Sequence, residues 1–238
     1  MSETFGAAIL GTGDVTGGHI RAYQTNPHTE VRAILSRDRE RAEAKARDHG
    51  LENCQAYTSL DELLKRDDIQ IVSVCTPHHL HVEQAIACAQ VGKHVIVEKP
   101  VALDLESLRK LDRAIREAHV RSIVSFVLRW NPLFNNIRTL LADGMIGDIF
   151  HGEVDYLHGI TKDLALYPWV RRKQFGGSAL LTAGCHAVDA LRWFVQREAV
   201  EVFSYATTSR GNPLDYEYEP NSVTLVRFDG GATGKVMT

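Results

Sequence analysis

Short apolar segments alternate with longer amphipathic segments through the first half of the chain. The apolar segments end at glycine, proline or charged residues, as strands buried on both faces of a sheet do, and the amphipathic segments have helical spacing. These patterns predict strands at residues 5–10, 31–35, 55–57, 69–75, 94–97 and 122–128 and helices at 14–25, 38–49, 60–65, 80–91 and 105–118. Ser59 is placed to cap the third of these helices. Strands that alternate with helices predict a parallel sheet with right-handed crossovers.

The alternation stops near Arg129 and Pro132, and a different arrangement follows. Helices are predicted at residues 133–141 and 179–195, and strands at 149–157, 200–207, 222–228 and from 232 onward. The predicted fold class is therefore α/β, with a Rossmann doubly wound parallel sheet in residues 1–129. An α+β domain with a large, mostly antiparallel open sheet is predicted in residues 130–238. Because the chain stops within its last strand, that strand would expose an unpaired edge, so we expect a truncated chain or a covering subunit.

Composition and charge narrow the class of protein. The chain has 238 residues, of which 44% are hydrophobic and 24% charged, as in an ordinary soluble protein with room for two domains. The net charge of -3 gives no electrostatic reason to expect nucleic acid or a lipid surface as a partner. No segment resembles a membrane helix or a secretory signal, and the scattered cysteines are typical of reduced thiols. We expect a cytoplasmic protein with a small-molecule partner.

The first loop carries the signature of a dinucleotide site. Residues Gly11, Thr12, Gly13, Asp14 and Val15 follow a predicted strand and open a predicted helix. A glycine at the first position permits a tight turn, and a glycine at the third lets the backbone approach a pyrophosphate at the helix N-terminus. The third glycine of the usual pattern is Thr16 here, which loosens the match. We expect this loop to hold the pyrophosphate of NAD or NADP.

The end of the second predicted strand bears on the choice between NAD and NADP. NAD enzymes usually place a carboxylate there for the ribose 2′-hydroxyl, whereas this chain has Ser36 and Arg37. A hydroxyl and a guanidinium suit a 2′-phosphate, which favours NADP. The alternative is that Arg37 is solvated and stacks on adenine without any phosphate preference.

Two loops leave the carboxyl ends of the fourth and fifth predicted strands, where ligands of open α/β sheets bind. The cofactor-binding candidates in these loops are Cys75, Thr76, Pro77, His78, His81, Glu98 and Lys99. Lys99 is well placed for proton transfer, although a lone lysine is more often a surface residue. The spacing of His78, His79 and His81 fits no standard zinc pattern, so no metal is predicted. We expect His81 to cap the following helix and line the cofactor cleft.

A further group of polar residues lies in the predicted helix 179–195. Thr182, His186 and Asp189 are spaced four and three residues apart, which places all three on one face of an α-helix. One interpretation is a catalytic group on that face. The other is that His186 and Asp189 form a buried polar pair that satisfies itself.

Together these residues resemble the glucose–fructose oxidoreductase / inositol dehydrogenase (Gfo/Idh/MocA) family. The matching residues are Gly11-x-Gly13 with His19, Thr76-Pro77 with His81, Glu98-Lys99-Pro100, Arg129, Gly144-x-Ile146-Gly147, Trp169, Gly176-Gly177 and Gly184-x-His186-x-x-Asp189. The resemblance implies a homodimer or homotetramer that associates through the sheet of the second domain. It also implies an NAD(P)-dependent oxidoreductase acting on a secondary alcohol of a sugar, inositol or related polyol.

The resemblance also implies roles for individual residues. Lys99 would be the acid/base, His186 would bind or relay the proton of the reacting hydroxyl, and Arg129 would contact the cofactor. Many family dehydrogenases carry an aspartate where this chain has Thr182, whose hydroxyl could still orient His186. From loop position alone, Tyr156, Trp169 and Arg171 are candidates for substrate binding. Lys99, His186 and Asp189 are the other substrate-binding candidates. Two alternatives remain: a sugar enzyme that retains NAD for a non-redox, glycosidase-like reaction, and a non-catalytic dinucleotide-binding protein.

Overall fold

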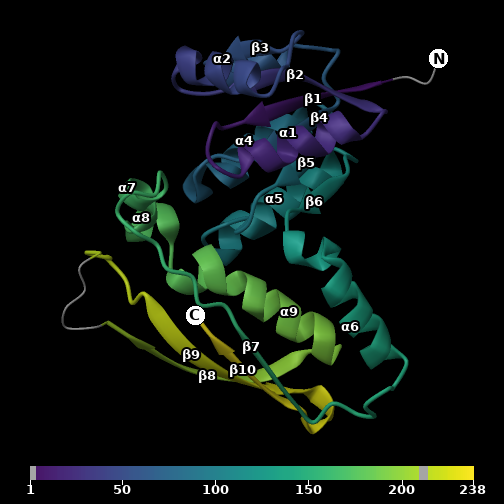
Figure 1. Cartoon of the computed structure of the whole chain (residues 1–238), viewed down its shortest axis with the longest axis vertical. Coiled ribbons are helices and arrows are strands. Elements are labelled where there is room, and N and C mark those ends of the chain that lie inside the picture. The colour runs from purple at the N-terminus through teal and green to yellow at the C-terminus, as the bar shows by residue number, and fades with distance from the viewer. Residues whose placement is uncertain (1–3, 209–213) are drawn as a thin grey trace. The chain divides into compact units, whose positions relative to one another are not determined.

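The structure is a computed structural model that describes residues 4–208 and 214–238. The chain divides into two units, Met1–Ser125 and Phe126–Thr238, which are described separately below (Figure 1).

The first unit contains a six-stranded parallel sheet in the order β3-β2-β1-β4-β5-β6. The strands are β1 (Phe5–Leu10), β2 (Thr29–Leu35), β3 (Gln55–Tyr57), β4 (Ile71–Val74), β5 (His94–Val97) and β6 (Ser122–Val124). The strand order reverses between β1 and β4, so the sheet is doubly wound, as predicted. In such sheets the loops at the carboxyl ends of β1 and β4 flank the ligand-binding crevice.

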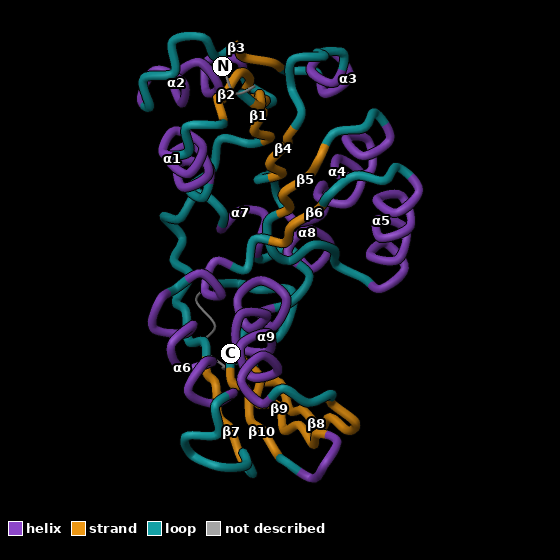
Figure 2. The backbone as a smooth tube through the Cα atoms, turned by 90° about the vertical axis from the view of Figure 1, so that its right-hand side faces the viewer, coloured by secondary structure: helices purple, strands orange, loops and turns teal. Residues whose placement is uncertain are grey.

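Five helices cover the two faces of this sheet. They are α1 (Thr16–Thr25), α2 (Arg39–Asp48), α3 (Leu60–Leu64), α4 (His81–Gln90) and α5 (Leu105–Glu117). Helices α1 and α2 lie on one face and α3, α4 and α5 on the other (Figure 2). Each face has its own hydrophobic cluster, one including Ile20 and Ala42 and the other including Leu63 and Leu111. The Ser59 hydroxyl accepts a hydrogen bond from the Glu62 N–H, which confirms the predicted cap.

Several predicted boundaries differ from the observed ones, and two of these differences follow from backbone contacts. The first helix was expected from Asp14 but begins at Thr16, because the Thr16 N–H bonds to the Gly13 carbonyl in a preceding turn. The strand expected at 122–128 ends at Val124, and Val127–Trp130 forms a 3₁₀ turn. The partner strand β5 ends at Val97, the residue paired with Val124, so no ladder remains for later residues to join.

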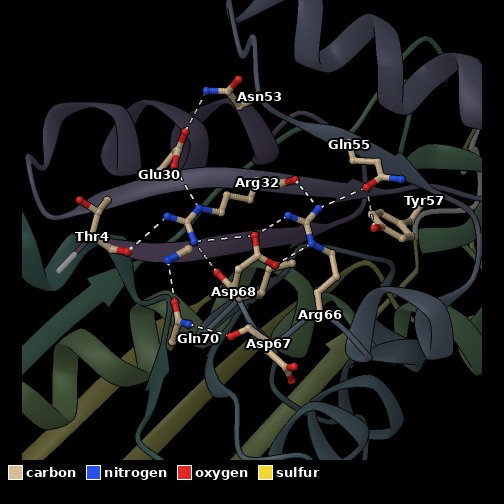
Figure 3. Close-up of polar contacts among 12 residues, drawn as sticks. Thr4, Glu30, Arg32, Asn53, Gln55, Tyr57, Arg66, Asp67, Asp68 and Gln70 are labelled. Atoms are coloured by element: carbon tan, nitrogen blue, oxygen red, sulfur yellow. Dashed lines mark hydrogen bonds and ion pairs between the residues drawn. The ribbon is translucent and has the colours of Figure 1, made fainter.

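Near the amino ends of the strands, charged residues link β2 to the loop before β4 (Figure 3). Arg32 in β2 donates to the backbone carbonyl of Asp68 at 2.7 Å, and Arg66 donates to both carboxylate oxygens of Asp68. The hydrogen bonds from Arg66 hold the pKa of Asp68 below its usual value. These contacts fix the loop before β4 at the edge of the sheet opposite the carboxyl ends.

The second unit contains a four-stranded sheet in the order β7-β10-β9-β8. The strands are β7 (His151–Asp155), β8 (Ala199–Thr207), β9 (Asn221–Phe228) and β10 (Thr233–Met237). Strand β9 pairs antiparallel with both neighbours, whereas β10 and β7 are parallel. The prediction that the last strand leaves an open edge was wrong, because β10 lies between β7 and β9.

The helices of the second unit are α6 (Pro132–Ala142), α7 (Tyr167–Val170), α8 (Lys173–Gly176) and α9 (Cys185–Val195). Helix α9 packs on the sheet through Ala187, Leu191 and Val195, which form a core cluster with residues of β9 and β10. Gly234 makes room for this packing, because a Cβ there would lie 2.7 Å from Cδ2 of Leu191.

The helix predicted at 179–195 is not a single α-helix. Leu180–Gly184 forms a π-helical turn, and the α-helix begins only at Cys185. The prediction of one continuous α-helix was therefore wrong, whereas His186 and Asp189, three residues apart, both lie in α9. Thr182, His186 and Asp189 each have a different set of neighbours, described below.

Candidate functional site

The glycine loop between β1 and α1 is shaped by backbone contacts at the carboxyl edge of the sheet. Gly11 has a φ of +107°, and a Cβ added there would lie 2.5 Å from the carbonyl oxygen of Cys75. Thr16, in place of the third glycine, is fully buried and donates its hydroxyl to the Gly11 carbonyl at 3.2 Å. A Cβ on Gly13 would meet nothing within 4 Å, so the loop presents bare backbone to open space at the start of α1. This arrangement fits a pyrophosphate.

Ser36 and Arg37 follow β2 and lie in different environments. Ser36 is buried, and its hydroxyl oxygen accepts from the Asp38 N–H at 3.3 Å while its proton can still be donated. Arg37 is exposed. The nearby carboxylate of Asp38 caps α2 by accepting from the Glu40 N–H at 2.9 Å. The side chains available to contact a ribose substituent here are therefore the Ser36 hydroxyl and the exposed guanidinium of Arg37.

His81 does not have the role expected for it. It is the first residue of α4 and not its cap, and it has no exposed surface, so its side chain cannot touch a bound nucleotide. Its Nε2 lies 2.7 Å from the Thr76 carbonyl and its Nδ1 lies 2.8 Å from the Pro100 carbonyl. Burial lowers the pKa of His81, although these two carbonyls act against that shift. His81 thus joins the loop after β4 to the loop after β5.

Lys99 lies in the loop after β5, next to the buried carboxylate of Glu98. One oxygen of Glu98 accepts from the Lys99 backbone N–H at 3.2 Å, and the other lies 3.0 Å from Nε2 of His19. The Ser73 hydroxyl lies 3.1 Å from Nδ1 of His19 and 2.8 Å from the Tyr23 hydroxyl, and sequence reasoning missed both Ser73 and Tyr23. Ser73 could have been noticed as a polar residue in an apolar strand, and Tyr23 lies one helical turn after His19.

In the second unit, His186 is buried among aromatic rings. Its ring centroid lies 5.1 Å from that of Tyr156 and 5.9 Å from that of Phe126. The ring of Tyr156 also stacks on that of His158, at 6.0 Å and an interplanar angle of 11°. The predicted candidates Tyr156 and His186 are therefore neighbours.

Asp189 and Arg129 form an ion pair. Nε and Nη2 of Arg129 each donate to a different carboxylate oxygen of Asp189, both at 2.8 Å. These hydrogen bonds raise the pKa of Arg129, whose guanidinium also lies 5.3 Å from the centroid of Trp193. One interpretation of the sequence paired Asp189 with His186, whereas in the structure the partner of Asp189 is Arg129.

The remaining candidates lie around α7 and the π-helical turn. Thr182 is buried and donates its hydroxyl to the Gly176 carbonyl at 3.1 Å. Arg171 donates to Asp215 at 2.9 Å and lies over the ring of Tyr167. Trp169 is half-buried in α7. Residues 209–213, which precede Asp215, lie outside the described part of the chain.

In residues 4–208 and 214–238, no group of three or more histidines, cysteines or carboxylates is arranged to hold a metal ion. Within the same ranges, no helix is both long and apolar enough to cross a membrane.

A doubly wound parallel sheet with a glycine loop at its switch point defines a nucleotide-binding α/β protein of the Rossmann class. The chain belongs to the GFO/IDH/MocA family. Residues 5–126 match the model of the oxidoreductase family with an NAD-binding Rossmann fold. Residues 134–238 match a GFO/IDH/MocA C-terminal domain.

Several named proteins similar to this chain are dehydrogenases. The trans-1,2-dihydrobenzene-1,2-diol dehydrogenase of Xenopus laevis is 32% identical over 205 residues, which cover 85% of this chain and 59% of that protein. The structure of a levoglucosan dehydrogenase with NADH and levoglucosan has a TM-score of 0.89 and 27% identity, covering 99% of this chain and 66% of that one. The structure of GenD2 from gentamicin A biosynthesis with NAD has a TM-score of 0.89 and 28% identity, covering 100% and 66%.

The chain spans less than two thirds of the length of such relatives. It covers 58% of an uncharacterised oxidoreductase of Synechocystis sp., to which it is 31% identical over 217 residues.

Proposed function

We propose that the protein is an NAD(P)-dependent oxidoreductase that acts on a secondary alcohol, or the matching ketone, of a sugar, inositol or related polyol. The observation that carries the proposal is the placement of Lys99 directly after β5, at the same sheet edge as the bare backbone of Gly13. A proton-transfer group and a pyrophosphate cradle at the carboxyl edge of one parallel sheet are what alcohol oxidation by a nicotinamide requires.

Lys99 is the acid/base in this proposal. In the oxidative direction its neutral Nζ takes the hydroxyl proton of the alcohol, and in the reductive direction its ammonium returns the proton. The nicotinamide, when bound, accepts or supplies the hydride. The residues that would hold the cofactor are the backbone of Gly11, Thr12, Gly13, Asp14 and Val15, the side chains of Ser36 and Arg37, and the loop Cys75, Thr76, Pro77 and His78.

The second unit supplies the substrate-binding side chains in this proposal. His186 binds the reacting hydroxyl, and Tyr156 packs against its ring and limits its rotation. Trp169 and Arg171 remain candidates for contact with substrate. Because both oxygens of Asp189 are used by Arg129, we assign Asp189 to positioning Arg129. Thr182 is assigned to holding the π-helical turn through Gly176.

A screen of the full-length protein tests this function. Sugars, inositols, anhydrosugars and cyclic diols are incubated with NAD⁺ and with NADP⁺, and formation of reduced nicotinamide is followed by its absorbance. The proposal predicts steady accumulation with at least one member of the panel. Accumulation with none of them, together with cleavage of a glycoside, would favour an enzyme that retains its nicotinamide for a non-redox reaction.

The preferred cofactor in this proposal is NADP. Arg37 is exposed and carries a guanidinium that suits a 2′-phosphate, and the Ser36 hydroxyl has a proton left to donate. Replacing Arg37 with alanine should weaken NADPH binding about tenfold, the scale of one charge-assisted hydrogen bond, and leave NADH binding nearly unchanged. Fluorescence titration of both nucleotides against both proteins measures this. Tighter binding of NADH that Arg37→Ala does not alter would make NAD the cofactor.

The proposal includes a homodimer or homotetramer that forms through the sheet of the second unit. Phe203 and Leu225 are cross-strand partners on the face away from α9, and they are 57% and 53% exposed. They line a groove of about 330 Å³. Exposed apolar patches of this kind mark interfaces. Leu225→Glu should therefore lower the solution mass measured by light scattering, whereas Leu105→Glu on α5 should not, and equal masses would remove the proposed interface.

The location we propose is the cytoplasm. Burial raises the pKa of the Cys54 thiol to about 11 and that of Cys88 to about 12, so both groups stay protonated and unreactive near neutral pH, as suits a reducing compartment.

A further inference from the structure

Four arginines and two other side chains line a pocket of about 270 Å³ in the second unit. They are Arg129, Arg138, Arg192, Arg197, Trp193 and Glu198. These residues come from the 3₁₀ turn Val127–Trp130, from α6, and from α9 and the segment that follows it. Helices α6 and α9 lie side by side (Figure 1), and the rings of Phe134 and Phe194 are 6.1 Å apart between them. We call this feature the arginine pocket.

The end of α9 brings two of these residues back beside the helix. Gln196 has a left-handed backbone with a φ of +58°, and its N–H donates to the Arg192 carbonyl at 3.0 Å. A left-handed residue at this point ends a helix and turns the chain back. The carboxylate of Glu198 therefore returns to Arg192 and accepts from its Nε and Nη2. The guanidinium of the exposed Arg197 lies near the hairpin turn, where a Cβ on Gly230 would be 3.9 Å from its Cζ.

Carboxylates neutralise only two of the four arginines in the pocket. One carboxylate pairs with Arg129 and another with Arg192, each through Nε and Nη2 of the guanidinium. In the part of the chain that the structure describes, no carboxylate oxygen lies within 4.0 Å of a side-chain nitrogen of Arg138 or Arg197. Two positive charges around the pocket are therefore left without a counterion from the described residues.

Arg138 also has an unsatisfied donor. Its side chain is half-buried, and its Nε is buried with no hydrogen-bond partner among residues 4–208 and 214–238. A buried donor on a charged group is costly to leave unsatisfied. Because no described residue holds this guanidinium, it can turn toward an anion without breaking a contact with the protein.

Electrostatic repulsion acts within the arginine pocket. Hydrogen bonds with Glu198 and its charge raise the pKa of Arg192, whereas burial and the nearby charge of Arg129 act against that shift. The partial negative charge at the carbonyl end of α9 favours cations, which accounts for Arg192 and Arg197. It does not account for Arg129 and Arg138, which come from other elements. A bound anion would offset the repulsion among all four.

The chemistry and size of the pocket select a class of ligand. Guanidinium groups bind phosphate and carboxylate oxygens through paired N–H donors, and two cations without counterions match a ligand with two negative charges. A volume of about 270 Å³ is small for a ligand site, which favours a small molecule. The net charge of -3 on the chain opposes binding of an extended polyanion such as nucleic acid.

We propose that the arginine pocket is a binding site for a small dianion of the phosphate-monoester class, separate from the nucleotide site. This inference goes beyond the proposed function and does not rest on it. The resemblance predicts that Arg129 contacts the cofactor, so the same chemistry could come from a phosphate of the dinucleotide. The experiment must therefore distinguish a phosphate of the nucleotide from a separate ligand.

Calorimetric titration of the full-length protein makes this distinction. The nucleotide site is first filled with whichever reduced nucleotide binds more tightly. Inorganic phosphate and glucose 6-phosphate are the probes, and glucose, which has the same ring without the dianion, is the control. We expect both probes to bind, and glucose to bind at least about tenfold more weakly than glucose 6-phosphate. The absence of binding by both probes, or binding that the nucleotide abolishes, would overturn the proposal.

Two substitutions locate the site. Arg138→Gln and Arg197→Gln each remove one positive charge and break no ion pair among the described residues. Each should weaken phosphate binding about tenfold, the scale of one charge-assisted hydrogen bond. Because Arg197 is exposed, its variant remains informative if Arg138→Gln does not fold.

Arg113→Gln is the matched control, since Arg113 is an exposed arginine of α5 in the first unit. It should leave phosphate affinity unchanged. Phosphate binding that neither pocket variant weakens, or that Arg113→Gln weakens equally, would show that the anion binds elsewhere and would refute the site.

Discussion

Replacing Lys99 with methionine is expected to lower turnover of the alcohol by roughly two orders of magnitude or more, the usual contribution of general acid–base catalysis. Methionine has a similar length and cannot accept or donate the proton. Because the pyrophosphate is assigned to backbone groups around Gly13, affinity for the reduced nucleotide should change little. The substitution therefore separates proton transfer from cofactor binding.

Steady-state kinetics and fluorescence titration of the reduced nucleotide check this prediction together. Lys110→Met is the matched control, since Lys110 is an exposed lysine of α5 that pairs with Glu106 at 2.8 Å. The control should keep its activity. A Lys99→Met protein that still turns over at the wild-type rate would show that the acid/base is another group.

Replacing Gly11 with alanine should abolish tight nucleotide binding and destabilise the first unit. The new Cβ would lie 2.5 Å from the Cys75 carbonyl oxygen, at a residue whose φ is +107°. Backbone strain of this kind costs on the order of 1–3 kcal/mol, and relief of the clash must move the loop that meets the pyrophosphate. We expect nucleotide affinity to fall by more than about tenfold, the equivalent of roughly 1.4 kcal/mol.

Gly50→Ala provides the comparison for Gly11→Ala. Gly50 also has a positive φ, +63°, but a Cβ there would meet nothing within 4 Å. It therefore introduces backbone strain without the collision. Nucleotide titration and thermal unfolding of both variants separate the two effects. If both variants bound nucleotide as the wild type does, the loop between β1 and α1 would not be the pyrophosphate site.

The alternation of apolar and amphipathic segments was sufficient to predict the parallel sheet, because each strand of such a sheet is buried on both faces. Strands β3 and β5 lie at their predicted residues. The error at residues 125–128 has a different origin. Those residues are mostly apolar, as in a strand, but the partner strand β5 ends at Val97, the residue paired with Val124. The length of a neighbouring strand cannot be predicted from the sequence of the strand that pairs with it.

The π-helical turn at Leu180–Gly184 could not be predicted for a related reason. Thr182 bonds to the Gly176 carbonyl and Gly184 approaches Thr238, so distant residues stabilise the wider turn. Local spacing therefore predicted one continuous α-helix where the chain forms a π-helical turn followed by α9.

The sequence identified the candidate site residues from their type and their position at the edge of the sheet. It did not identify the residues that they contact. Lys99 follows β5 as expected. The residues linked by hydrogen bonds to the neighbouring Glu98, which are His19, Ser73 and Tyr23, come from elements remote in sequence. Arg129 and Asp189 were both candidates, yet their ion pair spans 60 positions of the chain. Pairings over such distances depend on the assembled fold.

Transfer of isotope from substrate to cofactor tests the central claim most directly. An alcohol found active in the screen is prepared with deuterium on its carbinol carbon and incubated with the full-length protein and oxidised nicotinamide. The account predicts that the deuterium appears in the reduced nicotinamide and that kcat/KM shows a primary isotope effect. Deuterium that remains in the sugar product or is lost to water, with no labelled nicotinamide, would contradict it.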